Sequence, residues 1–292
     1  MFDLQGHRGA RGLFPENTLE GFAAAVRLGL RSFEIDVGVS RDGVPVLHHD
    51  PHLNPDIARG PDGQWLATRG PLLRELTLAE LQAYDVGRIR PGTAYAGKYS
   101  SQAPHDGARI PTLDSVLRLD PRLRFNIELK LLPEHPDWTV SADEMADRVI
   151  RVVDGAGAAN RVSIQSFDWR APLHVRRVRP ELSTGWLTTA NTVRGSPLWH
   201  GPAAIPDMEA VPDAIAARGG RSWTPHFTEL TPDLLARAQG LGLRVIPWTV
   251  NEEQDMRSLV LWGVDGLISD WPDRALPLLS LACERDGPGA AF

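Results

Sequence analysis

The chain has 292 residues, of which 42% are hydrophobic and 23% charged, and its formal net charge is -6. This length and composition are typical of an ordinary globular protein with a sizeable core, in one large domain or two. The 37 acidic residues outnumber the 31 basic ones, which argues against a general nucleic-acid or anionic-membrane surface. The single cysteine, Cys283, excludes an internal disulfide and a thiolate metal site.

The start of the chain shows no targeting signal. Met1-Phe2-Asp3-Leu4 has neither a basic segment nor an apolar one after it, and no later stretch reaches transmembrane length. We therefore expect a protein without a membrane anchor, cytoplasmic by default and periplasmic if a signal peptide was removed ahead of this numbering. The sequence leaves the oligomeric state open.

Runs of apolar and β-branched residues between turn residues predict strands. They lie at 3–7, 32–38, 45–48, 124–129, 162–166, 183–187, 221–224, 243–248 and 265–268. The turn from Ser40 to Gly43 joins the second and third strands, and it is too short for a parallel crossover, which needs about a dozen residues. These two strands therefore form an antiparallel hairpin, and eight strands remain without its return strand.

Helical segments alternate with most of these strands. They are predicted at 17–29, 142–155, 169–179, 208–218, 231–240 and 252–262. Asn17 is expected to cap the first helix, with Glu20 completing a capping box, and Thr231 with Pro232 opens the fifth. The alternation predicts the α/β class and a somewhat distorted (β/α)8 TIM barrel, formed by one domain over residues 1–292, with the hairpin as an extension.

Two segments fall outside this pattern. Residues 51–111 are rich in Gly and Pro and contain one predicted short helix, near 77–83. We interpret the segment as an insertion over the active-site mouth of the barrel, before the third barrel strand. Residues 284–292 include Gly-Pro-Gly and are expected to form a flexible tail.

Carboxylates gather where the predicted strands end. Glu34 and Asp36 lie two apart on one strand and share a face, as do Glu128 and Lys130 on another. Barrel enzymes place their chemistry at the C-terminal strand ends, and an all-oxygen set suits a hard divalent cation, Mg²⁺ or Ca²⁺. The alternative is a set of buried ion pairs with Arg8 and Lys130. Because histidines lie nearby, we favour the metal.

His7 and His49 each follow a predicted strand, and we expect them to face one another across the mouth. Neutral imidazole both accepts and donates protons, so such a pair can serve as general base and general acid. The fixed charges of Arg8 and Lys130 suit an anionic phosphoryl group. His48 points to the opposite face and is expected to have no catalytic role.

Motifs in order along nearly the whole chain resemble those of the glycerophosphodiester phosphodiesterases, a family of phospholipase C-like TIM-barrel phosphodiesterases. They are His7-Arg8-Gly9, Pro15-Glu16-Asn17-Thr18, Glu34-Ile35-Asp36-Val37, Asp42-Gly43-Val44-Pro45-Val46, His49-Asp50-Pro51, Ile110-Pro111-Thr112-Leu113, Glu128-Leu129-Lys130, Gln165-Ser166-Phe167, Trp248-Thr249-Val250-Asn251 and Gly263-Val264-Asp265-Gly266-Leu267-Ile268-Ser269-Asp270. The run from His52 to Arg59 and the long insertion depart from the family pattern, which leaves the range of substrates open.

The resemblance implies metal-dependent hydrolysis of glycerophosphodiesters to glycerol 3-phosphate and an alcohol. It also implies the roles of individual residues: metal ligation by Glu34, Asp36 and Glu128, acid–base catalysis by His7 and His49, and phosphate binding by Arg8 and Lys130. A small-molecule phosphodiester is the expected partner.

Four further residues are candidates for supporting roles. Phe167 and Trp248, at the ends of later strands, are expected either to line a slot for the glycerol or alcohol moiety or to fill the core. Glu16 precedes a helix and is expected either to favour its positive end or to hold Arg8. Asp50 is expected to support the site without touching the substrate.

Two other functions fit the sequence less well. A phospholipase D-like activity on lysophospholipids or sphingomyelin is disfavoured by the acidic composition and the missing anchor. A non-catalytic barrel that binds phosphodiesters has no need of an acid–base pair, so the histidines disfavour it.

Overall fold

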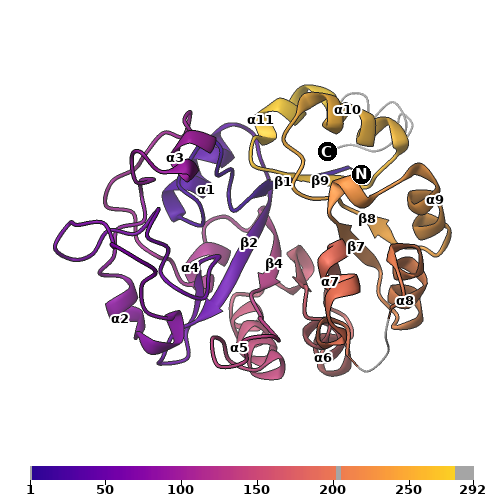
Figure 1. Cartoon of the computed structure of the whole chain (residues 1–292), viewed down its shortest axis with the longest axis horizontal. Coiled ribbons are helices and arrows are strands. Elements are labelled where there is room, and N and C mark those ends of the chain that lie inside the picture. Colours follow the sequence, from indigo (N-terminus) through magenta and orange to yellow (C-terminus); the bar gives the residue numbers. More distant parts are fainter. Residues whose placement is uncertain (1, 202–204, 280–292) are drawn as a thin grey trace.

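The computed structural model describes residues 2–201 and 205–279, and strands form its centre with helices around them (Figure 1). The strands in the described residues are β1 (Asp3–His7), β2 (Ser32–Val39), β3 (Pro45–Leu47), β4 (Arg124–Leu129), β5 (Val162–Ser166), β6 (Ser183–Thr188), β7 (Ser222–Pro225), β8 (Arg244–Val245) and β9 (Gly266–Ser269). The tail predicted at 284–292 and Cys283 lie outside the described residues.

Eight parallel strands form a nearly closed barrel, as predicted, in the order β8-β7-β6-β5-β4-β2-β1-β9. Strand β3 pairs antiparallel with β2, with Leu47 opposite Val37. Where β8 meets β9, the backbone N–H of Asp265 donates to the carbonyl of Val245 at 2.9 Å. Strand β8 is shorter than predicted because Pro247 has no N–H to offer a ladder.

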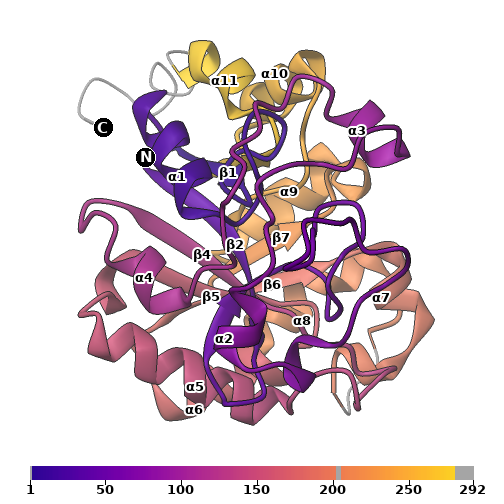
Figure 2. The ribbon, with the colours of Figure 1, turned by 90° about the vertical axis from the view of Figure 1, so that its left-hand side faces the viewer.

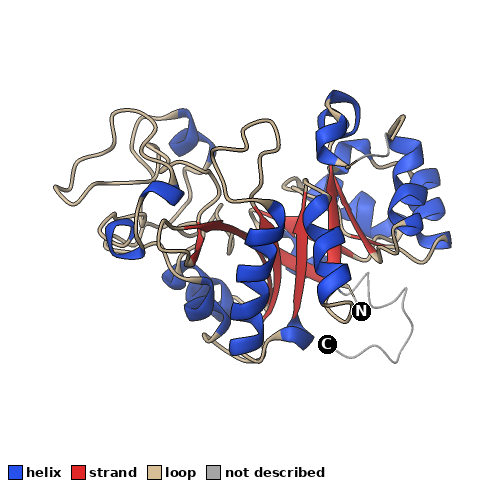
Figure 3. Ribbon diagram, turned by 90° about the horizontal axis from the view of Figure 1, so that it is seen from below, coloured by secondary structure: helices blue, strands red, loops and turns tan. Residues whose placement is uncertain are grey.

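Most of the helices lie on the outside of the strands (Figure 3). The α-helices in the described residues are α1 (Leu19–Arg27), α2 (Leu78–Leu81), α3 (Ala94–Lys98), α4 (Leu113–Leu117), α5 (Ala142–Gly155), α6 (Arg170–Val178), α7 (Ala190–Gly195), α8 (Val211–Ala217), α9 (Pro232–Gly240), α10 (Glu253–Trp262) and α11 (Pro272–Ala275). Helix α5 has the predicted bounds, whereas α3, α4, α7 and α11 were not predicted. None of the described helices is long and apolar enough to cross a membrane.

The N-terminus of α1 differs from the prediction. Thr18, not Asn17, is the capping residue, and its hydroxyl accepts a hydrogen bond from the backbone N–H of Gly21 at 3.0 Å. The side chain of Asn17 points elsewhere, because its amide donates to Asp36 Oδ2 at 2.9 Å. The expected capping box at Asn17 is therefore wrong, and this residue belongs to the site at the barrel mouth.

Alternation along β2 separates an apolar face from an acidic one. Phe33, Ile35 and Val37 are fully buried in the layer between strands and helices, where the Phe33 ring packs edge-on against Phe22 at 5.4 Å. The side chains between them, Glu34 and Asp36, take the opposite face. The strand thus turns its carboxylates toward the barrel interior.

Residues 51–111, predicted as an insertion and called the insertion below, face the viewer in Figure 2 and contribute most of a small apolar core separate from that of the barrel. The buried members of this core are Val46, Leu53, Ala58, Leu73, Leu81, Val86 and Ile110. The predicted helix near 77–83 is present as the shorter α2, capped by Thr77. Helix α3 is an additional helix of the same segment, and Thr93 caps it.

Candidate active site

Glu34 and Asp36 of β2 and Glu128 of β4 form a buried carboxylate cluster. The parallel register places Asp36 directly beside Glu128, and each of the three residues offers an oxygen within 4.8 Å of the others. Their exposed fractions are 2%, 0% and 7%. The metal ligands predicted from strand alternation are therefore brought together.

The electrostatics of the carboxylate cluster are those of a site for a cation. Burial and the charges of its partners raise the pKa of Glu34 well above its ordinary value, and burial raises that of Glu128. Burial would also raise the pKa of Asp36, but the attraction of Arg8, together with that of His49 and Lys130, outweighs burial and holds that pKa low. Glu34 Oε1 and Asp36 Oδ1 are buried without a hydrogen-bond donor among the described residues. Unsatisfied carboxylate oxygens in this arrangement fit a hard divalent cation.

Two cations lie against the carboxylate cluster. Arg8 Nε is 3.2 Å from Asp36 Oδ2, and Lys130 Nζ is 2.7 Å from Glu128 Oε1 and 3.5 Å from Asp36 Oδ1. Arg8 Nη1 also donates to Glu16 Oε1 at 3.0 Å. The cations thus lie where a phosphoryl group beside the cluster would meet them, and in this structure they neutralise carboxylates.

His7, the last residue of β1, lies between two acids. Its Nδ1 is 2.6 Å from Asp270 Oδ1, and its Nε2 is 3.6 Å from Glu34 Oε2. Burial, together with the charge of Arg11, lowers the pKa of His7 to about 4. The imidazole is therefore neutral at pH 7, and Asp270 fixes the ring by its Nδ1 edge.

His49 follows β3 and has the same kind of support. Its Nδ1 is 2.7 Å from Asp50 Oδ1, and Asp50 Oδ2 accepts a hydrogen bond from Asn54 at 2.8 Å. Burial and the charges of Arg8 and Lys130 lower the pKa of His49 to about 4. Both candidate acid–base residues thus have an aspartate at Nδ1, and the Nε2 atom is left for chemistry.

Asp270, which the motifs included without a role, is the centre of a hydrogen-bond network. It follows β9 and accepts from Arg11 Nε at 2.6 Å, from the Tyr99 hydroxyl at 3.0 Å and from Asn251 Nδ2 at 2.9 Å. The useful sequence signal was an acid at the C-terminal end of a barrel strand, the same signal that identified Glu128.

Tyr95 of α3 and Tyr99, which caps the C-terminus of this helix, give no comparable signal in the sequence. The hydroxyl of Tyr95 donates to Glu16, the residue that holds Arg8, and Tyr99 donates to Asp270, which holds His7. Burial raises the pKa of both phenols above their ordinary value, which keeps each hydroxyl a donor. The insertion is therefore bonded to the supports of two candidate site residues.

Phe167 and Trp248 come from distant strand ends and meet. Their rings pack edge to face with centroids 5.3 Å apart, and both side chains are half-buried. Trp248 also donates from its indole N–H to the carbonyl of Thr224 at 3.0 Å. A role in lining a substrate slot stays a prediction.

Comparison with known proteins gives a consistent result. Residues 7–274 match the model of the glycerophosphoryl diester phosphodiesterase family. A glycerophosphodiester phosphodiesterase from Caldanaerobacter subterraneus subsp. tengcongensis is 29% identical over 94% of this chain and 96% of its own.

Solved structures share the fold. A protein from Silicibacter pomeroyi DSS-3, assigned to the glycerophosphoryl diester phosphodiesterases, is 36% identical with a TM-score of 0.86, over 96% of this chain and 93% of its own. A phosphodiesterase from Oleispira antarctica, solved in complex with the product sn-glycerol-3-phosphate, has a TM-score of 0.72 at 22% identity, over 95% of this chain and 96% of its own.

Proposed function

The chain belongs to the glycerophosphoryl diester phosphodiesterase family, and from that premise we propose a metal-dependent hydrolysis of glycerophosphodiesters to glycerol 3-phosphate and an alcohol, with His7 and His49 as the acid–base pair. The observation that carries the proposal is the carboxylate cluster, whose oxygens lie within 4.8 Å of one another beside His7. The product bound in the structure of the Oleispira antarctica protein is the one this reaction would release.

The residues at the barrel mouth would have different roles in this reaction. A divalent cation held by the carboxylate cluster would supply positive charge to the phosphoryl group. Arg8 and Lys130 would bind its non-bridging oxygens and stabilise the charge that grows on them in the transition state. Phe167 and Trp248 would receive the glycerol moiety against their rings.

Proton transfer falls to the two histidines. One removes a proton from the nucleophile and the other protonates the leaving alkoxide. Because the pKa of each is about 4 in the free protein, the acid must gain its proton as the substrate binds. The negative charge of the phosphodiester favours the imidazolium and would raise the pKa of the histidine beside it.

The proposal is tested by measuring the release of glycerol 3-phosphate from several diesters. We expect His7→Ala and His49→Ala each to reduce turnover by about a hundredfold or more. The exposed His105 offers a matched control, since His105→Ala removes an imidazole without touching the site. Near-normal activity in either site variant overturns the acid–base assignment.

Metal dependence has its own test. EDTA is expected to abolish the release of glycerol 3-phosphate, and added Mg²⁺ or Ca²⁺ to restore it. An undiminished rate in chelator contradicts the role of the carboxylate cluster. Including a lysophospholipid among the substrates separates this function from a phospholipase D-like one. Binding of a phosphodiester without turnover in the metal-replete protein would indicate a non-catalytic barrel.

A further inference from the structure

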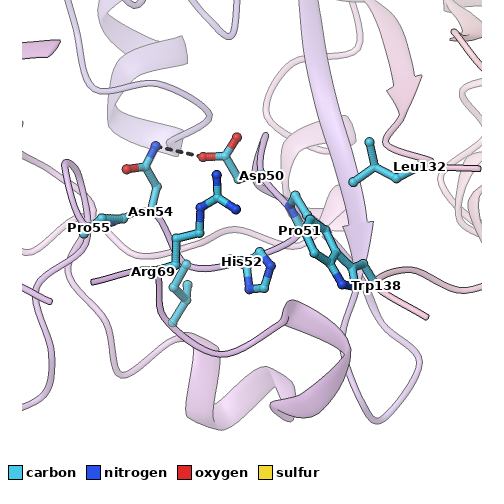
Figure 4. Close-up of a pocket in the computed structure, with 9 residues that line it drawn as sticks. Asp50, Pro51, His52, Asn54, Pro55, Arg69, Leu132 and Trp138 are labelled. Atoms are coloured by element: carbon cyan, nitrogen blue, oxygen red, sulfur yellow. Dashed lines mark hydrogen bonds between the residues drawn. The ribbon is translucent and has the colours of Figure 1, made fainter. Parts of the chain in front are cut away.

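A cavity of about 320 Å³ opens next to His49 (Figure 4). We call it the Arg69 cavity. The lining residues that matter here are Asp50, His52, Asn54, Arg69, Leu132 and Trp138. Asp50 is bonded to His49, and a narrower cavity that shares Asp50 and Trp138 reaches Lys130. An occupant of the Arg69 cavity would therefore lie within reach of a phosphoryl group bound at the barrel mouth.

The walls of the Arg69 cavity are fixed by contacts between two segments, the insertion and the loop after β4. Arg74 of the insertion donates to the carbonyls of Asp137 and Thr139, at 3.0 and 2.9 Å, on either side of Trp138. The Trp138 indole meets the His52 ring edge to face at 4.8 Å. The cavity is thus formed before a ligand enters, which reduces the cost of binding.

Asp50 and Arg69 differ in how much of their hydrogen-bonding capacity is already used within the protein. Both oxygens of Asp50 are already used, by His49 and by Asn54. The Arg69 guanidinium points to the edge of the cavity near Asp50 and Asn54, and within the described part of the chain it forms no hydrogen bond or ion pair. Because Arg69 is exposed, its five N–H donors are available to an acceptor from outside the protein.

We propose that the Arg69 cavity holds the alcohol moiety of the substrate and selects alcohols that carry an anionic group, a second phosphate or a carboxylate. The inference rests on the proposed function, in which Phe167 and Trp248 on later strand ends take the glycerol moiety. The planar guanidinium binds phosphate and carboxylate in two-pronged fashion, and the indole of Trp138 covers the carbon skeleton of the alcohol.

The test compares kcat/KM within two substrate pairs that differ by one anionic group. The first pair is glycerophosphoinositol and glycerophosphoinositol 4-phosphate, and the second is glycerophosphoethanolamine and glycerophosphoserine. A charge-assisted hydrogen bond predicts a kcat/KM about tenfold or more higher for the anionic member. The two pairs distinguish a phosphate from a carboxylate as the favoured group.

Variants of Arg69 connect any preference to the cavity. In Arg69→Gln the ratio of kcat/KM within each pair is expected to fall to about one, and Arg69→Lys to keep part of the preference because it keeps the charge. The control is Arg88→Gln, which removes a charge that pairs with Asp106 elsewhere on the insertion. It should leave the ratios of the wild type unchanged.

The outcomes are distinct. Equal kcat/KM within both pairs, or a preference that survives Arg69→Gln, overturns the subsite while leaving the proposed function intact. Absence of glycerol 3-phosphate from every diester, glycerophosphoethanolamine included, overturns the proposed function and the subsite with it. A preference that is lost in Arg69→Gln but kept in Arg88→Gln supports the subsite.

Discussion

Two of the three carboxylates of the cluster, Glu34 and Glu128, weaken the fold at neutral pH when no cation is bound. Burial raises the pKa of Glu34 and Glu128, so the folded protein binds protons at these groups more tightly than the unfolded chain does. A carboxyl group with a raised pKa contributes fully to stability below its unfolded value, near 4.5, and that contribution is lost as the pH rises. The cation would remove this penalty.

Glu34→Gln is therefore expected to raise the Tm measured in EDTA at pH 7, because the variant has no carboxyl group at this position that must be buried as a charge or protonated on folding. Each kcal/mol added to the free energy of unfolding raises the Tm by about 2–4 °C in a protein of this size. The gain over the wild type should shrink as the pH falls toward 4.5, where the wild-type carboxyl is protonated. Thermal unfolding from pH 4.5 to 7.5 measures both effects.

The same variant should lose the metal response. Added Ca²⁺ or Mg²⁺ is expected to raise the Tm of the wild type, since a ligand of the folded state stabilises it, and to do much less in Glu34→Gln. Two results would contradict the role given to Glu34. One is a Tm of Glu34→Gln below that of the wild type in EDTA at pH 7, and the other is an increase in Tm on metal addition equal to that of the wild type.

Some residues of the site could be predicted from the sequence and others could not, for a physical reason. Glu34 and Asp36 share a strand face, so alternation alone brings them together. Asp270 contacts His7, which lies 263 positions away in the sequence, and Asn17 donates to Asp36 instead of capping α1. Such contacts depend on how the barrel closes, which local patterns do not encode.

Among the elements, α3 has the most direct connection to the chemistry. Tyr95 and Tyr99 lie one helical turn apart, and their hydroxyls reach separate supports, Glu16 for Arg8 and Asp270 for His7. Removing either hydroxyl leaves a carboxylate short of one donor and lets the residue that it holds move. The two phenols should therefore have different kinetic effects.

Tyr99→Phe is expected to lower kcat by about tenfold, since it loosens the aspartate that orients His7. Tyr95→Phe is expected chiefly to raise KM, because it loosens the support of Arg8, the residue proposed to bind the phosphoryl group. The third tyrosine, Tyr84, packs against the apolar core of the insertion and makes Tyr84→Phe the matched control. Steady-state kinetics on a single diester distinguish the three variants.

A purely structural role for α3 predicts something else. Tyr95→Phe and Tyr99→Phe would then lower the Tm and change kcat and KM no more than Tyr84→Phe does. Equal effects of the two variants on both kinetic constants would likewise contradict separate supports for His7 and Arg8.

Most elements could be read from the sequence because their own residues specify them. Helix α5 begins at Ala142 after the Ser141 cap and carries an apolar stripe over fourteen residues. Helix α3 has five residues and no buried one, and tertiary contacts through Tyr95 and Tyr99 hold it in place. A short helix that is held by tertiary contacts does not need a periodic apolar pattern in its own sequence, so the sequence does not reveal it.

Closure of the barrel depends on a narrow seam between β8 and β9. Asp265 Oδ2 accepts a hydrogen bond from the backbone N–H of Val245 at 2.8 Å and one from Gln239 at 3.2 Å. Asp265→Ala is therefore expected to lower the free energy of unfolding by about 1–3 kcal/mol. Urea unfolding measures the loss.

The matched control for the seam is Gln239→Ala, which removes one donor to Asp265 and keeps the bond to Val245. It should cost clearly less stability than Asp265→Ala. KM should stay near that of the wild type in both variants, because the seam lies away from the carboxylate cluster. Equal unfolding free energies for Asp265→Ala and the wild type would show that backbone contacts alone close the barrel.

The whole-molecule architecture was predictable because it repeats. Strands alternate with helices, and the four-residue turn before Val44 identifies the hairpin whose return strand lies outside the eightfold count. The seam was not predictable, since the run after Leu243 reads as one strand although its regular pairing covers only Arg244–Val245, with Trp248 adding an isolated bridge to His226. Pro247 interrupts it, and loop backbone completes the circle.

The position of α3 within the insertion limits how this protein can be redesigned. Residues 51–111 look like an exchangeable segment, and a graft from a relative would replace Arg69, His52 and Asn54 of the cavity in one step. The same graft would remove Tyr95 and Tyr99. A chimaera needs both phenols restored one turn apart, so libraries aimed at new substrates should randomise the residues around Arg69 and keep α3 constant.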